Sequence, residues 1–215
     1  MSDEKRRALK VREKQWVSKV AARISRMHIT PNQISLASVV FALLAAGGFV
    51  GFGVAHNPWY LLVVAVMVQL RLLCNLFDGL VAIEGGKSTP SGELFNDVPD
   101  RFADVVILVS LGYAAADHVY AVELGWAAGV LAVMTAYARI LGTSLSAPTL
   151  FIGPMAKQHR MALVTGVCLL AIIELWLFAS HYVLYVGLWV LVLGSAITVY
   201  RRLRLIRQFL EQNHV

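Results

Sequence analysis

The chain has 215 residues, of which 58% are hydrophobic and only 15% are charged. Soluble domains carry about 25% charged residues, so a water-soluble globular fold is excluded and a bilayer is the expected surrounding of the apolar segments. The formal net charge is +6. The Lys and Arg residues gather next to apolar segments, which indicates orientation signals and contacts with anionic lipid headgroups rather than nucleic-acid binding.

The first 28 residues are polar and basic, and nine of the nineteen Lys and Arg residues lie between Lys5 and Arg26. Over 4–27 the apolar residues recur on or near one face of a predicted helix, with cations on the other face. This pattern predicts a basic amphipathic helix that lies along the cytoplasmic membrane surface. A solvated basic tail is the alternative. Thr30 is the expected cap of the next helix, with Pro31 at its first position.

Six later segments approach the length and apolarity that a membrane-spanning helix needs. Six crossings place both termini on one side, together with the loops that contain Lys87, Lys157 and Arg160. The positive-inside rule makes this side cytoplasmic. We therefore expect an all-α, multi-pass protein of the inner membrane, with a six-helix domain over 29–200 and a basic cytoplasmic tail over 201–215. The expected spans are 33–55, 59–83, 101–117, 120–145, 161–180 and 182–200.

Polar residues concentrate between Asn75 and Asp104, where a membrane segment carries them at a cost in free energy and functional residues are expected. Two series have helical spacing and so each occupies one helix face. Carboxylates held together require a cation among them, and oxygen ligands suit Mg²⁺, Mn²⁺ or Ca²⁺. The first series is Asn75, Asp78, Gly79 and Ala82, and the second is Gly92, Asn96, Asp100 and Asp104.

Small residues in both series allow a phosphate ligand to approach the backbone. Positive charge for phosphate oxygens is available from Lys157, Arg160 and Arg139. These features favour phosphoryl-type transfer on a metal-bound diphosphate. The alternative is structural: Asp97 and Asp100 would cap a helix that begins before Pro99, and Asp78 would pair with Arg71 or Arg101.

The stretch NLFDGLVAIEGGKSTPSGELFNDVPD, from Asn75 to Asp100, resembles the signature of the CDP-alcohol phosphatidyltransferases, D-x2-D-G-x2-A-R-x8-G-x3-D-x3-D. Five positions agree at the family's spacing. The first and third aspartates of the signature are replaced by Asn75 and Asn96, and its arginine by Ile83. The segments ITPNQIS, before the first span, and GPMAKQHRMAL, from Gly153 to Leu163, also look like family segments. The agreeing residues are Asp78, Gly79, Ala82, Gly92 and Asp100.

The resemblance implies a six-helix homodimer that transfers a phosphatidyl group from a CDP-linked lipid to an acceptor alcohol, with release of CMP. In the family four aspartates bind two divalent cations, Mg²⁺ or Mn²⁺, and the last aspartate is the proposed base. It thus implies Asn75, Asp78, Asn96 and Asp100 as metal ligands, with Asp100 also catalytic. Two neutral amides weaken the binding of a second cation. The implied CDP and phosphate contacts are Gly79, Ala82, Gly92, Lys157, Arg160 and Arg139.

Two other classes of function stay open. The two asparagines and Ile83 suggest a non-catalytic relative that binds a nucleotide lipid or serves as a partner subunit. A small transporter with Asp78 and Asp100 as an ion site is less well supported, because the polar groups gather at one membrane face. The acceptor alcohol is not specified by these residues.

Overall fold

The computed structural model describes residues 23, 30–84, 86, 90–148, 152–178 and 180–212. The predicted amphipathic helix over 4–27 lies outside them, apart from Arg23. In the described ranges the regular structure is helical, which agrees with the predicted all-α class. The helices are α2 (Pro31–Ala55), α3 (Pro58–Glu84), α4 (Gly92–Ala114), α5 (Ala121–Ser144), α6 (Lys157–Phe178) and α7 (Tyr182–Gln212).

The start of α2 follows from its first residues. The Thr30 hydroxyl accepts a hydrogen bond from the Gln33 amide, and the Gln33 side chain accepts one from the Thr30 amide. This capping box satisfies two helix-end donors, and Pro31 at the first position has no N–H to satisfy. The predicted cap at Thr30 is confirmed.

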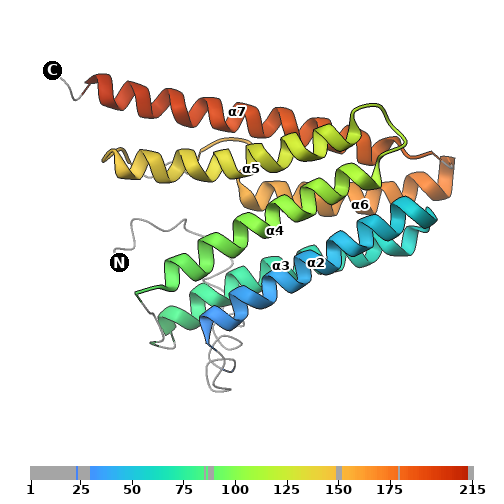
Figure 1. The fold of residues 1–215 in the computed structure, drawn as a ribbon, viewed down its shortest axis with the longest axis horizontal. Coiled ribbons are helices and arrows are strands. Elements are labelled where there is room, and N and C mark those ends of the chain that lie inside the picture. The colour runs from blue at the N-terminus through green and yellow to red at the C-terminus, as the bar shows by residue number, and fades with distance from the viewer. Residues whose placement is uncertain are drawn as a thin grey trace.

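The six helices form a closed ring in the order α2, α3, α6, α7, α5 and α4, and α4 also contacts α7 across it. Figure 1 shows that α2 and α4 begin at the same end of the bundle at which α3, α5 and α7 end. We call this the site end. An apolar core fills the ring interior with Phe49, Leu61, Ile107, Met161 and Leu188, all fully buried.

Large apolar side chains also cover the outside of the ring, as expected for a bundle surrounded by lipid. Trp176 is 81% exposed and Val54 is 82% exposed. Five of the six described helices, α2, α3, α5, α6 and α7, are long and apolar enough to cross a membrane. α7 has 31 residues, or about 46 Å at 1.5 Å per residue, so it is longer than the roughly 30 Å hydrocarbon layer.

The sixth helix, α4, differs from the prediction. It begins at Gly92 rather than at residue 101 and contains Pro99, so Asp97 and Asp100 lie inside the helix and do not cap it. The missing N–H of Pro99 removes one helical hydrogen bond, yet burial of Asp100 and Ala103 on one face keeps the helix continuous. Charged residues in its first half keep α4 out of the set of helices apolar enough to span.

The last helix extends beyond the predicted span 182–200, because residues 201–212 continue α7 without a break. Close helix packing uses glycine. A Cβ added to Gly125 on α5 would lie 2.8 Å from the Cα of Gly112 on α4, and one added to Gly187 would lie 2.7 Å from the Val167 side chain. These glycines therefore serve contacts within one chain.

Candidate active site

A buried network of charges joins α3, α4 and α6 near the middle of α3 and α4. Asp104 on α4 accepts hydrogen bonds from Arg71 on α3 and Arg160 on α6, each at 2.7 Å and each to a different carboxylate oxygen. The three side chains are at most 1% exposed. Arg160 also donates to the Thr135 hydroxyl at 3.0 Å and to the Met155 carbonyl at 2.9 Å. The network fixes α3, α4, α5 and α6 relative to one another.

Asp100 lies one helical turn before Asp104 and contacts the same cation. Arg71 Nη2 is 3.4 Å from Asp100 Oδ1, and Lys157 Nζ donates to Asp100 Oδ2. The Asp100 side chain is 5% exposed. The predicted base is therefore held between two cations from two other helices, which orient its carboxylate.

Asp78 on α3 is also buried, and its Oδ2 accepts a hydrogen bond of 2.7 Å from the Ser35 hydroxyl on α2. It lies close enough to Asp100 and Lys157 for both of their charges to act on its carboxylate. The neighbouring Asn75 has a buried side-chain nitrogen without a hydrogen-bond partner among the described residues. The structure therefore brings Asp78, Asp100 and Lys157 together, with Asn75 beside them on α3.

Other residues considered in the sequence analysis lie at the exposed edge of the buried charged cluster, which we call the rim. Asn96 is exposed. Asp97 is 38% exposed and pairs with Arg139 at 3.1 Å and with Arg101 at 3.4 Å. Arg139 thus contacts Asp97 rather than Asp100. The structural alternative for Asp78 does not hold either, because Arg71 pairs with Asp100 and Asp104, and Arg101 pairs with Asp97.

The small residues of the signature border the carboxylates. Gly79 follows Asp78 directly, Ala82 lies one turn further along α3, and both are half-buried. Gly92 is the first residue of α4, and it is half-buried too. Small side chains at these positions would allow a ligand to approach the helix backbone.

The donor set determines which cations the site fits. In the described part of the chain, no cluster of three or more His, Cys, Asp or Glu side chains is placed to hold a metal. The two carboxylates Asp78 and Asp100, with the amide oxygen of Asn75, fit one hard divalent cation such as Mg²⁺ or Mn²⁺. A second cation lacks comparable ligands, because Asn96 is exposed and neutral.

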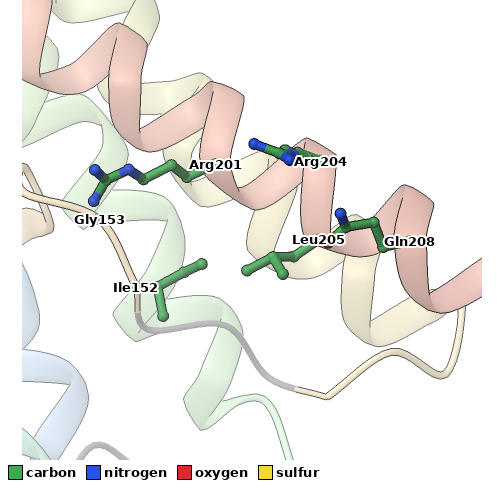
Figure 2. A pocket seen from close by; sticks show the side chains of 6 residues that line it. All are labelled: Ile152, Gly153, Arg201, Arg204, Leu205 and Gln208. Atoms are coloured by element: carbon green, nitrogen blue, oxygen red, sulfur yellow. The ribbon is translucent and has the colours of Figure 1, made fainter.

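A cavity of about 360 Å³ lies where α7 passes the segment that precedes α6. Figure 2 shows Ile152 and Leu205 facing each other across it, with Arg201 and Arg204 on the α7 side. Gly153 has a φ of +114°, and a Cβ there would lie 2.4 Å from the Thr198 side chain, so glycine is required. The same short segment leads directly to Lys157, and two guanidinium groups give the opening a positive charge.

The opposite end of the bundle carries a separate polar group. His56 Nε2 donates to Asp117 Oδ2 at 3.0 Å, and the ring centroids of His56 and His181 are 4.9 Å apart. The hydrogen bond from His56 lowers the pKa of Asp117 below its usual value, and the charges of nearby histidines act in the same direction. This group ties the loop between α4 and α5 to the end of α2.

Ser35, Thr135 and Arg202 were not predicted as parts of this region. Ser35 belongs to the family-like ITPNQIS segment, so a signal for it existed. Arg202 donates to the Ile152 carbonyl at 3.1 Å and to the Thr135 carbonyl. Nothing in the basic run over 201–207 distinguishes this buried arginine from its exposed neighbours.

Comparisons with known proteins agree with the fold and the signature. No protein-family model matches the chain. The chain is 25% identical over 190 residues to a phosphatidylinositol phosphate synthase of Mycolicibacterium smegmatis, covering 87% of this chain and 82% of that protein. It is also 24% identical over 145 residues to the inner membrane protein YnbA of Escherichia coli, covering 67% and 69% of the two chains.

Solved structures of the Mycobacterium tuberculosis phosphatidylinositol phosphate synthase PgsA1 share the fold. With CDP-DAG bound, that protein superposes with a TM-score of 0.71 at 21% identity, over 90% of this chain and 94% of that chain. Its complex with manganese and citrate gives a TM-score of 0.70 at 20% identity, over 88% of each chain.

The fold and the site define a membrane helical bundle with a charged, oxygen-rich site at one end of its interior. The signature spacing and the relatives named phosphatidylinositol phosphate synthase indicate the CDP-alcohol phosphatidyltransferase family, and the chain shares the fold of PgsA1.

Proposed function

We propose that this protein is a membrane-embedded transferase of phospholipid synthesis. It moves a phosphatidyl group from a CDP-linked lipid, CDP-diacylglycerol, to an acceptor alcohol and releases CMP. The observation that carries the proposal is the burial of Asp78 and Asp100, two carboxylates at signature spacing on different helices. Lys157 contacts Asp100, and the charges of Asp100 and Lys157 both act on Asp78. The relative named phosphatidylinositol phosphate synthase and the CDP-DAG complex of PgsA1 support the same reaction.

In this mechanism Asp100 accepts the proton of the acceptor hydroxyl. The alkoxide attacks the β-phosphorus of the CDP-lipid, and the bond from that phosphorus to the CMP oxygen breaks. Ser35 and Arg71 hold the two carboxylates in place. Asp78, Asp100 and Asn75 would hold one Mg²⁺ or Mn²⁺, with Asn96 at the rim, and the cation would neutralise the diphosphate and the leaving group. The manganese complex of PgsA1 supports the choice of metal.

The half-buried Gly79, Ala82 and Gly92 would accommodate the cytidine diphosphate between α3 and α4. Lys157 would neutralise phosphate oxygens next to Asp100, and Arg139 would act at the rim. Arg160 would act through Asp104, since its guanidinium is buried. The cavity beside Arg201 and Arg204 favours an acceptor that carries an anionic group, because guanidinium groups bind phosphate and carboxylate well.

The topology belongs to this proposal. We infer six crossings, with α4 as the sixth, because α4 completes the ring and its charged half faces the ring interior or the site end. Cations at the site end favour a cytoplasmic location for it and for both termini, next to anionic lipids. The inner membrane location has support from YnbA, and a homodimer is supported by family resemblance alone.

A CMP-release assay tests the proposal, with purified full-length protein, CDP-diacylglycerol, Mg²⁺ and a panel of acceptors that includes phosphate-bearing alcohols. A base acting on an alcohol contributes about 10²–10⁴ in rate. Asp100→Asn should lower CMP release by that factor while CDP-lipid binding changes by only several-fold. Asp97→Asn is the matched control, because Asp97 points to the rim, and it should retain most of the rate.

The two asparagines of the signature support a second candidate, a non-catalytic relative that binds a nucleotide lipid or partners another subunit. Binding of CDP-diacylglycerol without CMP release from any acceptor would favour this candidate. Equal rates for Asp100→Asn and the wild type, with loss in Asp97→Asn, would instead show that Asp100 is not the base.

A further inference from the structure

Asp100 is already neutralised by cations that belong to the fold. Lys157 contacts one of its carboxylate oxygens and Arg71 the other. Arg71 is fully buried and is held by Asp104, which Arg160 holds in turn. These contacts fix the Arg71 guanidinium group beside Asp100. In a low-dielectric interior a fixed cation at this distance opposes the approach of another cation.

The charges of this cluster balance without a metal. Three carboxylates, Asp78, Asp100 and Asp104, face three cations, Arg71, Lys157 and Arg160. A diphosphate diester bridge brings about two negative charges, which one divalent cation neutralises. A second divalent cation would leave two positive charges in excess in a buried site, which is unfavourable.

We propose that Lys157, backed by Arg71, supplies beside Asp100 the positive charge that a second divalent cation supplies in two-metal members of this family. The chain then binds a single divalent cation, held by Asp78, Asp100 and the Asn75 amide oxygen. This inference rests on the proposed function for the site but concerns cation binding rather than turnover. Asn75 and Asn96 remove two negative charges that the family signature carries. Lys157 adds a positive charge beside Asp100, so both changes reduce the need for a second divalent cation.

The experiment counts cations directly. Purified full-length protein in nanodiscs, saturated with CDP-diacylglycerol, is titrated with Mn²⁺. Free Mn²⁺ is read by electron paramagnetic resonance, and bound Mn²⁺ by elemental analysis after gel filtration. The wild type should bind one Mn²⁺ per chain. Lys157→Gln should bind its first Mn²⁺ at least about tenfold more tightly, because a neighbouring positive charge is gone.

Arg101→Gln is the matched control, since it removes a cation one residue from Asp100 that pairs with Asp97. It should leave the Mn²⁺ affinity within about twofold of the wild type. The triple variant Asn75→Asp, Asn96→Asp and Lys157→Gln should bind two Mn²⁺ per chain. Gel filtration and thermal unfolding confirm that each variant is folded.

Two Mn²⁺ per chain in the wild type, at comparable affinity, would overturn the inference. So would equal effects of Lys157→Gln and Arg101→Gln, or no Mn²⁺ binding at all. The CMP-release assay decides the proposed function separately. CMP release with two Mn²⁺ bound refutes only the inference, whereas one bound Mn²⁺ without CMP release refutes only the activity.

Discussion

Asp104→Asn tests the buried network most directly. Asp104 is 1% exposed and holds Arg71 and Arg160 at 2.7 Å each. Asparagine keeps the size of the side chain but removes its charge and replaces one acceptor oxygen with an NH₂ group. One of the two arginines then faces a donor instead of an acceptor. Arg160 loses its carboxylate partner, and Arg71 keeps its 3.4 Å contact with Asp100.

The expected cost is large because both cations stay buried. Removing one partner of a buried ion pair costs about 3–5 kcal/mol, since an uncompensated charge is left behind. Asp97→Asn is the internal comparison, because Asp97 also contacts two arginines but is 38% exposed. Exposed pairs contribute about 0–1 kcal/mol. The two substitutions should therefore differ by at least about 2 kcal/mol in the free energy of unfolding.

Reversible unfolding in mixed detergent micelles, followed by tryptophan fluorescence, measures both variants. A double-mutant cycle with Arg160→Met isolates the pair, and contacting partners of this kind couple by about 0.5–3 kcal/mol. If Asp104→Asn costs no more than Asp97→Asn, or if the cycle shows no coupling, the reasoning about a buried counter-ion is wrong.

The remaining predictions concern other parts of the fold. A cytoplasm-sensitive reporter fused at residue 215 should be active, and an external reporter silent, if the site end is cytoplasmic. Gly125→Val should destabilise the bundle by about 1–3 kcal/mol, because its Cβ would lie 2.8 Å from the Gly112 Cα. Gly166→Ala, with nothing within 4 Å of the added Cβ, should be neutral or stabilising in the same unfolding measurement. The lowered pKa of Asp117 means that its stabilisation is complete above its usual pKa and is lost as the pH falls through the lowered value. Comparing unfolding of the wild type and Asp117→Asn at pH 6 and at pH 2.5 should show a difference of at most about 1 kcal/mol that vanishes in acid, because the pair is exposed. A difference that grows in acid would contradict it.

Helical spacing predicts which face of α3 turns towards the bundle interior. Asn75 and Asp78 lie on one stripe, and only a stripe turned inward avoids exposing a carboxylate to lipid. The structure buries Asp78 on α3 and Asp100 on α4. The signature defines the spacing of these residues along the chain. The packing of α3 and α4 in the ring then brings the signature residues of the two helices into one region.

The partners of the charged residues were not predictable in the same way. Spacing within one segment says nothing about Lys157, which lies 57 residues after Asp100 and contacts it. The pairing of Arg71 with Asp104 depends on the position of α3 along α4, which spacing within one segment does not define. Arg71 did carry a signal, because a cation within a predicted span requires a buried partner.

The start of α4 shows why a charged segment was misjudged. Hydropathy moved the predicted start to residue 101, since the residues before it are polar and include Pro99. Inside a ring of six helices, however, polar residues of one helix face cations of the others instead of lipid. Asp100 and Asp104 satisfy Arg71, Lys157 and Arg160 there. The charged residues of α4 make it too polar to be recognised as a lone span. The same residues form the ion pairs that join α4 to α3 and α6 at the charged site.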